Sequence, residues 1–296
     1  MDPSNDKINF CFIGEFPSVM EGIIILTGLS KSQLKKFQLS KKYLQKTIRK
    51  GDIISLPINL LNQNMVNPVY VGPDVKILFE NKNIITLSKP PRVHGHPLSY
   101  NESDNILSFL RKEGRATELE VNKANYDRGL LYRLDFETSG LIIYSKNEEL
   151  YKVVRANLKE VIKTKTYLAV VDGKLNQEGL LTHYLKSFGK KGAKVEICSS
   201  SDIDSKKVEC KVKLIEFNKE ENLSLVEVEL FQGARHQIRK QLEAIGNTIY
   251  GDPLYGSREA PRMYLHCWKY RIVWEEELLL SDNNLSLFLK LFHFNG

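Results

Sequence analysis

Cysteine is scarce in this chain of 296 residues, and its four cysteines are scattered without any Cys-x-x-Cys spacing. That scatter argues against a disulfide framework and against a structural zinc site. Long apolar runs are also missing, because none approaches the roughly 20 residues that a membrane-spanning helix needs. Residues 1–7 lack the basic segment and apolar core of a secretion signal. We therefore expect a soluble, cytoplasmic protein that has no membrane partner.

Extremes of composition are absent too. Hydrophobic residues make up 42% of the chain and charged residues 27%, which excludes disordered, collagen-like and coiled-coil proteins. The length suits one large domain with a small companion, or two domains. His94 and His96 form a His-x-His pair that would bind a metal only if a third ligand approached, and they sit in an irregular loop. We expect no metal site.

The net charge of +7 is concentrated near the start of the chain. Residues 1–77 carry 10 Lys/Arg against 6 Asp/Glu, a balance of +4, whereas residues 78–296 carry 33 against 30, a balance of +3. Eight of the ten basic residues lie between Lys31 and Lys50, and that interval contains no acid. Two interpretations are open: a solvated helical surface, or a surface for RNA or DNA phosphates, since clustered cations release the counterions of a nucleic acid.

Periodicity divides the chain into helices and strands. Over 34–48 apolar residues recur at spacings of three and four, Ser40 suits an N-cap and Gly51 suits a helix stop. We predict two short helices there, followed by strands over 52–56 and 69–78. Farther on, the pattern predicts strands over 84–87, 167–171 and 225–231, helices over 105–111 and from Asn147, and a flexible connection over 186–207.

One acidic side chain, Asp135, falls on a turn between two apolar strand-like runs and is flanked by Arg133. The polar run 135–140 is typical of a tight connection at the margin of a sheet, and catalytic groups tend to sit on loops held by rigid elements. The structural alternative is that Asp135 caps its own turn through the backbone amides of Glu137 or Thr138.

A second informative segment, Gly-Ala-Arg-His-Gln-Ile-Arg at 233–239, directly follows the predicted strand 225–231. Apolar residues at 238, 242 and 245 recur at helical spacing and a glycine ends the pattern. The helix would carry Arg235 and Arg239 in its first turns. Two cations at a helix N-terminus oppose the macrodipole, so they need an anionic partner, either Asp135 or an RNA phosphate.

Five short segments follow one another along the chain and are informative together. Tyr167, in the second segment, would by itself be interpreted only as a core aromatic with its hydroxyl at the edge. The five segments are Arg-Leu-Asp-x-x-Thr-Ser-Gly at 133–140, Lys-x-Tyr-x-Ala at 165–169, His-Gln-Ile-Arg at 236–239, Gly-Asp-Pro-Leu-Tyr-Gly at 251–256 and Leu-His at 265–266. In this order they resemble the RluA-type family of RNA pseudouridine synthases, over roughly residues 78–280.

The resemblance implies that Asp135 is the catalytic carboxylate, that Tyr167 stacks on the uracil, and that Arg239 pairs with and orients Asp135. It also implies that no cofactor is needed. A carboxylate can attack the anomeric carbon of uridine or remove the neighbouring ribose proton, and both options stay open. Because the target nucleotide must leave its stack, basic groups should hold the flanking phosphates. The expected RNA contacts are Arg133, Lys165, Arg235, His236, Gln237, Lys41, Lys42, Lys46, Arg49 and Lys50.

The basic N-terminal segment resembles the small S-four RNA-binding domain, with 39–51 as its second helix and 71–77 as its closing strand. Where such domains usually carry Val-Asn-Gly, this chain reads Ser-Leu-Pro at 55–57. The catalytic segment also departs from the family at Tyr132, where His is frequent, at Phe136, where a basic or long residue is common, and at Ala234, where Arg is usual. These departures bear on RNA contact outside the catalytic centre.

Together these features predict an α+β catalytic domain over 78–296, with a mixed, mainly antiparallel sheet and a central cleft, preceded by a small basic α/β RNA-binding domain over 1–77. The expected function is site-specific conversion of uridine to pseudouridine in structured RNA, with large-subunit ribosomal RNA as the first substrate and transfer RNA as the second. The rival functions are a catalytically inactive RNA-binding protein or RNA chaperone on the same fold, and a metal-dependent nuclease that uses His94, His96 and acids.

Overall fold

The computed structural model of the chain describes residues 7–27, 31–37, 39–57, 60, 66–67, 69–98, 102–115, 119–123, 125, 127–189, 194–256 and 258–292. The chain divides into two compact units. The first comprises residues 1–72 and 96–129, and the second comprises residues 73–95 and 130–296. The division therefore falls near the predicted boundary at residue 77, with 96–129 joining the first unit. That residues 1–77 form an RNA-binding domain stays a prediction.

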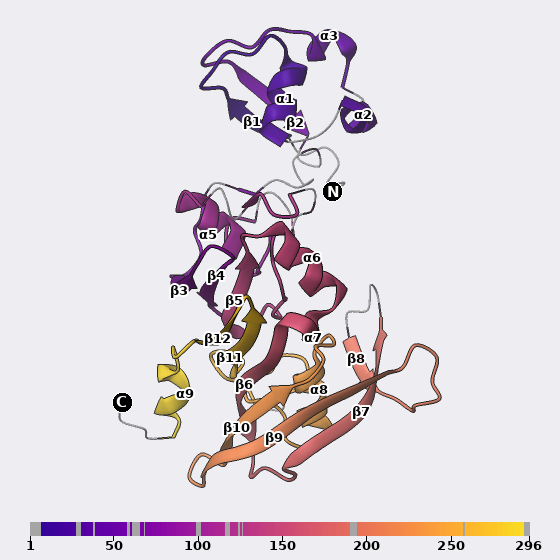
Figure 1. The fold of residues 1–296 in the computed structure, drawn as a ribbon, viewed down its shortest axis with the longest axis vertical. Helices are drawn as coiled ribbons and strands as arrows, with labels where there is room; N and C mark the ends of the chain where they lie inside the picture. Colours follow the sequence, from indigo (N-terminus) through magenta and orange to yellow (C-terminus); the bar gives the residue numbers. More distant parts are fainter. Residues whose placement is uncertain are drawn as a thin grey trace. The chain divides into compact units, whose positions relative to one another are not determined.

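The N-terminal part of the first unit is a small α/β structure. Strand β1 (Lys7–Cys11) pairs with β2 (Ile53–Pro57) in antiparallel register. In sequence, α1 (Val19–Thr27), α2 (Lys31–Leu34), the 3-10 turn η2 (Lys35–Phe37) and α3 (Lys41–Leu44) come between these strands. The three α-helices are labelled in Figure 1. Their buried apolar side chains form one core, which consists of Phe12, Val19, Ile23, Leu34, Ile48, Ile54, Leu56 and Leu60.

Two predictions for this segment are wrong. The helix predicted to run toward residue 51 ends at Leu44, although Ser40 does cap it, since its Oγ accepts a hydrogen bond from the Tyr43 amide at 3.2 Å. Ile48 instead exchanges backbone hydrogen bonds of 3.0 and 3.1 Å with Phe16. Pairing with a distant segment thus replaces the local helix. The strand predicted over 69–78 begins only at Lys76, whereas the strand over 52–56 is confirmed as β2.

Residues 96–129 carry one helix, α5 (Ile106–Lys112), within their described part. Asn105 caps it, because the Asn105 side chain accepts a hydrogen bond from the Ser108 amide at 3.0 Å. The predicted helix over 105–111 is therefore confirmed.

A large twisted sheet forms the second unit. Its described strands follow the order β3-β4-β5-β11-β6-β10-β9-β7-β8, and β12 pairs with β11 off this path. Their bounds are β3 (Lys76–Glu80), β4 (Ile84–Lys89), β5 (Ser139–Ser145), β6 (Ile162–Asp172), β7 (Gly179–Phe188), β8 (Lys194–Ile197), β9 (Lys206–Asn218), β10 (Leu223–Leu230), β11 (Leu265–Trp274) and β12 (Glu276–Ser281). Of the pairs among these strands, only β5–β11 is parallel.

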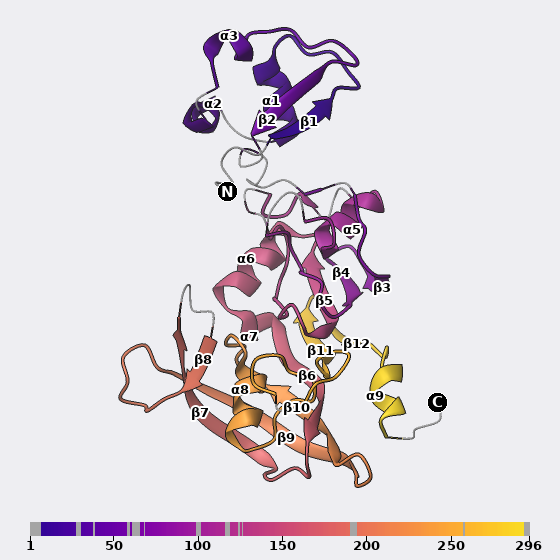
Figure 2. The same cartoon turned by 180° about the vertical axis from the view of Figure 1, so that it is seen from behind.

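Helices pack on this sheet in the two views of Figures 1 and 2. They are α6 (Glu148–Ala156), α7 (Leu158–Val161), α8 (Gln237–Ala244) and α9 (Ser286–Lys290). Side chains alternate along β6, so Leu168 and Val170 join Phe288 of α9 in one core cluster, while Tyr167 points to the other face. None of the helices in the described residues is both long and apolar enough to span a membrane.

The sheet and helices confirm an α+β fold with a mixed, mainly antiparallel sheet, whereas the central cleft stays a prediction. The predicted flexible connection over 186–207 is wrong in part, because 186–188 continue β7, 194–197 form β8, and β9 begins at residue 206. Residues 198–205 between β8 and β9 do form an irregular connection of turns. The predicted helix after strand 225–231 is confirmed as α8, but it begins at Gln237, so Arg235 precedes it.

Candidate active site

The Asp135 loop joins Leu131 to β5 at the place where β5 meets β11. The turn is closed by main chain, since the Thr138 amide donates to the Asp135 carbonyl at 3.1 Å. The Asp135 carboxylate accepts from Nη1 of Arg239 at 3.3 Å, and its side chain is 30% exposed. Its carboxylate therefore has a role other than capping its own turn. Gly140 ends the loop with φ +114°, and a Cβ there would overlap the Cys267 carbonyl, so only glycine lets β5 approach β11 this closely.

Arg239 is held from behind by a second acid. Its Nε and Nη2 each donate to a carboxylate oxygen of Asp252 at 2.7 Å, in the bidentate geometry that suits guanidinium. The side chains of Arg239 and Asp252 are only 3% and 1% exposed. Burial would raise the pKa of Asp252, but the hydrogen bonds and charge of Arg239 outweigh burial and lower it. Both groups are thus charged at neutral pH, and Nη1 of Arg239 is left for Asp135.

The segment before α8 adds a ring pair to this group. His236 occupies the N-cap of α8 in the left-handed region, at φ 51°. Its Nδ1 lies 3.0 Å from the Tyr255 hydroxyl, and its Nε2 lies 3.9 Å from Oδ2 of Asp135. Tyr255 also places its ring 5.2 Å from the guanidinium carbon of Arg239. Burial lowers the pKa of His236 although Asp135 opposes the shift, so the imidazole is neutral at neutral pH.

Tyr167 is fixed by its neighbours rather than open to solvent. It is 4% exposed, and it stands opposite Cys267 in the pairing of β6 with β11. The Tyr132 ring lies 4.3 Å from Nζ of Lys165, which donates to the Gln232 carbonyl. Burial raises the pKa of Tyr167 well above its usual value. The tyrosines are therefore neutral, and the ring of Tyr167 is held in one orientation.

Lys89 anchors the Asp135 loop from inside the protein. It lies at the end of β4, is fully buried, and its ammonium donates to the carbonyls of Pro90, Val93 and Phe136 at 2.9, 2.8 and 3.3 Å. Burial lowers its pKa to about 7, against the opposing pull of the Asp135 charge. The three carbonyl acceptors join residues 90–93 to the loop.

A buried chain of polar side chains secures the other end of the loop. Ser139 Oγ lies 2.9 Å from Nδ1 of His266, whose Nε2 lies 3.0 Å from the Asp282 carbonyl. Arg262 also donates to Ser139 Oγ. The order Ser-His-Asp resembles a hydrolase triad, but all three residues are buried and burial lowers the pKa of His266. We assign this chain to support of the loop, because no substrate reaches a hydroxyl enclosed in this way.

The predicted RNA contacts divide by exposure. Arg133 and Arg235 are exposed beside the Asp135 loop and before α8, and the N-terminal cations Lys41, Lys42, Lys46, Arg49 and Lys50 are exposed in the first unit. Lys165 and Gln237 are buried: Gln237 accepts from the amides of Gly233 and Ala234 at 3.1 Å and donates to the Glu209 carbonyl. For Lys165, Gln237 and the buried His236 we propose roles in shaping the site in place of direct RNA contact.

Several supporting residues escaped the sequence patterns. They are Asp252, Tyr255, Lys89, Ser139 and His266. Asp252, Tyr255 and His266 lie inside the ordered segments at 251–256 and 265–266, so those segments were the available signal. Lys89 carried no signal, because a lysine followed by prolines is typical of a surface loop. In the part of the chain that the structure describes, no three His, Cys, Asp or Glu side chains gather as a metal ion would require.

Comparison of the sequence with known proteins identifies a family. Residues 83–244 match the model of the RNA pseudouridylate synthase family. A Bacillus subtilis protein named uncharacterized RNA pseudouridine synthase YhcT is 26% identical over 240 residues, which cover 79% of this chain and 76% of the relative. Ribosomal large subunit pseudouridine synthase D of Borreliella burgdorferi is 26% identical over 203 residues, covering 67% of this chain and 61% of the relative.

Solved structures share the fold. Human RNA pseudouridylate synthase domain containing 1 superposes with a TM-score of 0.58 at 20% identity, covering 73% of this chain and 87% of that one. The family match spans more than half of the chain and includes Asp135, Tyr167 and Arg239. The chain belongs to the RluA-type family of RNA pseudouridine synthases.

Proposed function

We propose that Asp135 is the catalytic carboxylate of this RNA pseudouridine synthase and that Arg239 positions it. One observation carries the proposal: buried Asp252 fixes two nitrogens of Arg239 and leaves Nη1 facing Asp135 at 3.3 Å. A carboxylate paired in this way points in one direction. Such preorganisation is what proximity catalysis requires.

The reaction sets three requirements for the site. The glycosidic bond of uridine must break, the uracil must turn over, and a ring carbon must bond to the sugar. Asp135 either attacks the anomeric carbon or removes the neighbouring ribose proton. Tyr167 is the aromatic proposed to contact the uracil, and its burial keeps the ring in place before the substrate arrives. The proposed reaction needs no metal or cofactor.

For the substrate, we infer large-subunit ribosomal RNA first and transfer RNA second. The name of the Borreliella burgdorferi relative, ribosomal large subunit pseudouridine synthase D, supports the first choice, as does the resemblance of the basic N-terminal segment to an S-four domain. Exposed cations at Lys41, Lys42 and Lys46 suit RNA phosphates. A cytoplasmic location follows from such a substrate.

The test compares pseudouridine maps of total RNA from cells that carry the wild-type protein, no protein, or the Asp135→Asn variant. One modified position should vanish in both the deletion and the variant, while the affinity of the purified variant for that RNA stays near wild type. Asp202→Asn is the matched control, because Asp202 also lies on a turn and its carboxylate accepts the Ser199 amide at 2.8 Å. A fully active Asp135→Asn enzyme would remove Asp135 from the chemistry.

The rival functions predict different outcomes. A catalytically inactive RNA-binding protein or chaperone would bind RNA with no position lost from the map. A metal-dependent nuclease would lose its activity in EDTA, whereas the proposed isomerisation continues in EDTA.

A further inference from the structure

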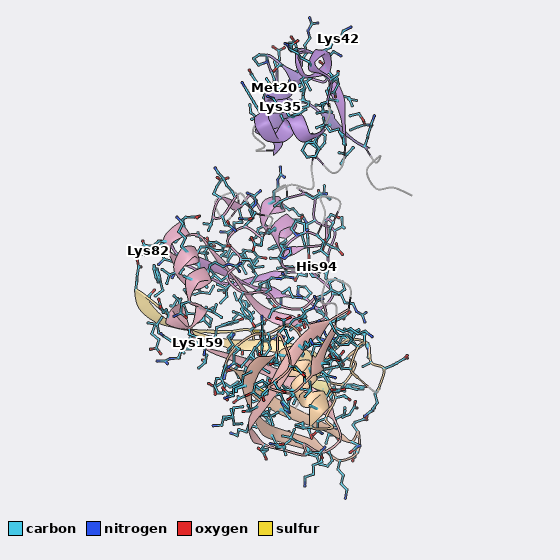
Figure 3. All side chains as sticks on the ribbon, turned by 90° about the vertical axis from the view of Figure 1, so that its right-hand side faces the viewer. Met20, Lys35, Lys42, Lys82, His94 and Lys159 are labelled. Carbon is cyan, nitrogen blue, oxygen red and sulfur yellow. The ribbon has the colours of Figure 1, made fainter. Side chains whose placement is uncertain are left out.

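Two aromatic rings, those of Phe136 and His94, lie against each other, and Phe136 is the residue next to the proposed catalytic carboxylate. Phe136 follows Asp135 directly and is 40% exposed. Its ring centroid lies 4.6 Å from that of His94, with the ring planes tilted by 37°; His94 is labelled in Figure 3. One side of the Phe136 ring is therefore covered by another ring. Single exposed apolar residues are ordinary on protein surfaces, so the exposure itself needs further support.

The support comes from how firmly the backbone of Phe136 is held. Its carbonyl accepts hydrogen bonds from the Arg92 amide at 2.8 Å and from the buried Lys89 ammonium at 3.3 Å. The neighbouring Glu137 pairs with Nε of Arg92 at 3.2 Å. The loops 90–94 and 135–138 are thus joined at three points, so the backbone that carries the Phe136 ring is fixed next to Asp135. A rigid aromatic loses little conformational entropy when it stacks on a ligand.

The charges nearby suit a polynucleotide. Arg133 is exposed two residues before Asp135, and the Arg92 side chain is 59% exposed. Proteins that hold single strands combine cations for phosphates with aromatic faces for bases. When a target nucleotide leaves its stack, the base next to it loses its stacking partner. An aromatic face beside the pocket would replace that partner.

We propose that Phe136, backed by His94, is a stacking platform for the unpaired nucleobase next to the target uridine. The proposal rests on the proposed function, because it takes Asp135 as the point where the target uridine sits. It assigns a second base-binding site to the enzyme, and the ligand class is an unpaired nucleobase of any identity, since every base has a flat face. Phe136 stands where the family commonly has a basic or long side chain, so the platform belongs to this chain's own substrate recognition.

The experiment measures affinity for a nine-nucleotide single-stranded RNA that has one uridine at its centre and adenines elsewhere. A second probe lacks the two bases that flank the uridine. Phe136→Ala should weaken binding of the intact RNA about 5- to 100-fold, whereas Phe136→Trp should keep near wild-type affinity. Leu180→Ala is the control, because Leu180 is another exposed apolar residue of the same unit, at 56% exposure.

The abasic probe decides what the ring contacts. Wild type should bind the abasic RNA more weakly than the intact RNA. Phe136→Ala should bind the two RNAs with nearly the same affinity, because the substitution and the removal of the bases eliminate the same interaction. Equal affinities of wild type and Phe136→Ala for the intact RNA would overturn the proposal. It would also be overturned if the loss of affinity from removing the flanking bases were as large in Phe136→Ala as in wild type. These are binding measurements, so they can succeed or fail whether or not Asp135→Asn abolishes pseudouridine formation, and the two proposals are tested separately.

Discussion

Asp252 gives the sharpest test of how the site is held together. Asp252→Asn keeps an oxygen that can accept the amides of Leu254 and Tyr255, which Asp252 accepts at 2.8 and 3.2 Å, but it removes the negative charge behind Arg239. Breaking a buried ion pair from one side costs about 3–5 kcal/mol. In the variant, Arg239 retains its contacts with Asp135 and with the Tyr255 ring. We therefore expect a loss of unfolding free energy at the lower end of this range, about 3 kcal/mol, and a fall in melting temperature of about 6–12 °C.

Catalysis should suffer as well. Without its buried partner, the guanidinium of Arg239 is free to turn toward Asp135 or away from it. A misplacement of about 1 Å costs on the order of 100-fold in rate, so the single-turnover rate of pseudouridine formation should fall by about that factor. RNA affinity should change little, because Asp252 is buried.

The pH dependence of this stability effect has a definite sign. The pKa of Asp252 is lower in the folded protein than its ordinary value, so its stabilising contribution is present above the unfolded pKa of about 3.9 and is lost as pH falls through the folded value. The difference in unfolding free energy between wild type and Asp252→Asn should therefore be constant near neutral pH and shrink in acid.

Urea unfolding followed by tryptophan fluorescence measures the stability, because both tryptophans, Trp268 and Trp274, lie on β11 of the catalytic unit. Glu277→Gln is the matched control: Glu277 also makes a two-point contact with an arginine, Arg271, at 2.8 and 3.0 Å, but that pair is exposed and should contribute little. An Asp252→Asn enzyme with wild-type stability and rate would refute the idea that Asp252 holds Arg239 for catalysis.

Two other predictions concern lysines. Burial holds the pKa of Lys89 at about 7, below its unfolded value of about 10.4. The unfolding free energy of wild type relative to Lys89→Met should therefore rise by about 1.4 kcal/mol per pH unit between pH 7 and 10 in urea unfolding, and a difference that does not change with pH would contradict the assignment. RNA binding should weaken, and its salt dependence should become less steep, when residues 1–70 are deleted or when Gln replaces Lys41, Lys42, Lys46, Arg49 and Lys50. An unchanged salt dependence of the affinity would show these cations to be only a solvated surface.

Local sequence patterns predicted much of the second unit, because neighbouring residues determine the conformation of its strands and helix caps. Val226 to Leu230 alternate between buried apolar and half-buried acidic side chains, and Asn147 accepts the amides of Glu149 and Leu150 as a helix cap should. The order of the motifs predicted that Asp135 and Arg239 meet, and they do at 3.3 Å. Such predictions succeed where sequence neighbours determine the conformation.

The remaining features depend on distant contacts. Ile48 has helical spacing from Leu44, yet its backbone pairs with Phe16, which the local period cannot show. Asp252 lies 117 residues beyond Asp135 in the sequence, and only the fold reveals that both bind Arg239. Lys89 reads as a surface cation, and its burial depends on three carbonyls that converge in space.

The parallel contact of β5 with β11 has a consequence for the protein as it is being synthesised. All three proposed catalytic residues precede residue 244, yet Asp252, His266 and Asp282, which hold Arg239 and the Asp135 loop, come later in the chain. At 5–20 residues per second, a ribosome takes about 2–8 s to add the 38 residues from 244 to 282. During that interval the nascent chain contains the proposed catalytic residues but lacks residues that hold them in position. Isomerase activity should therefore arise only after β11 and β12 have joined the sheet.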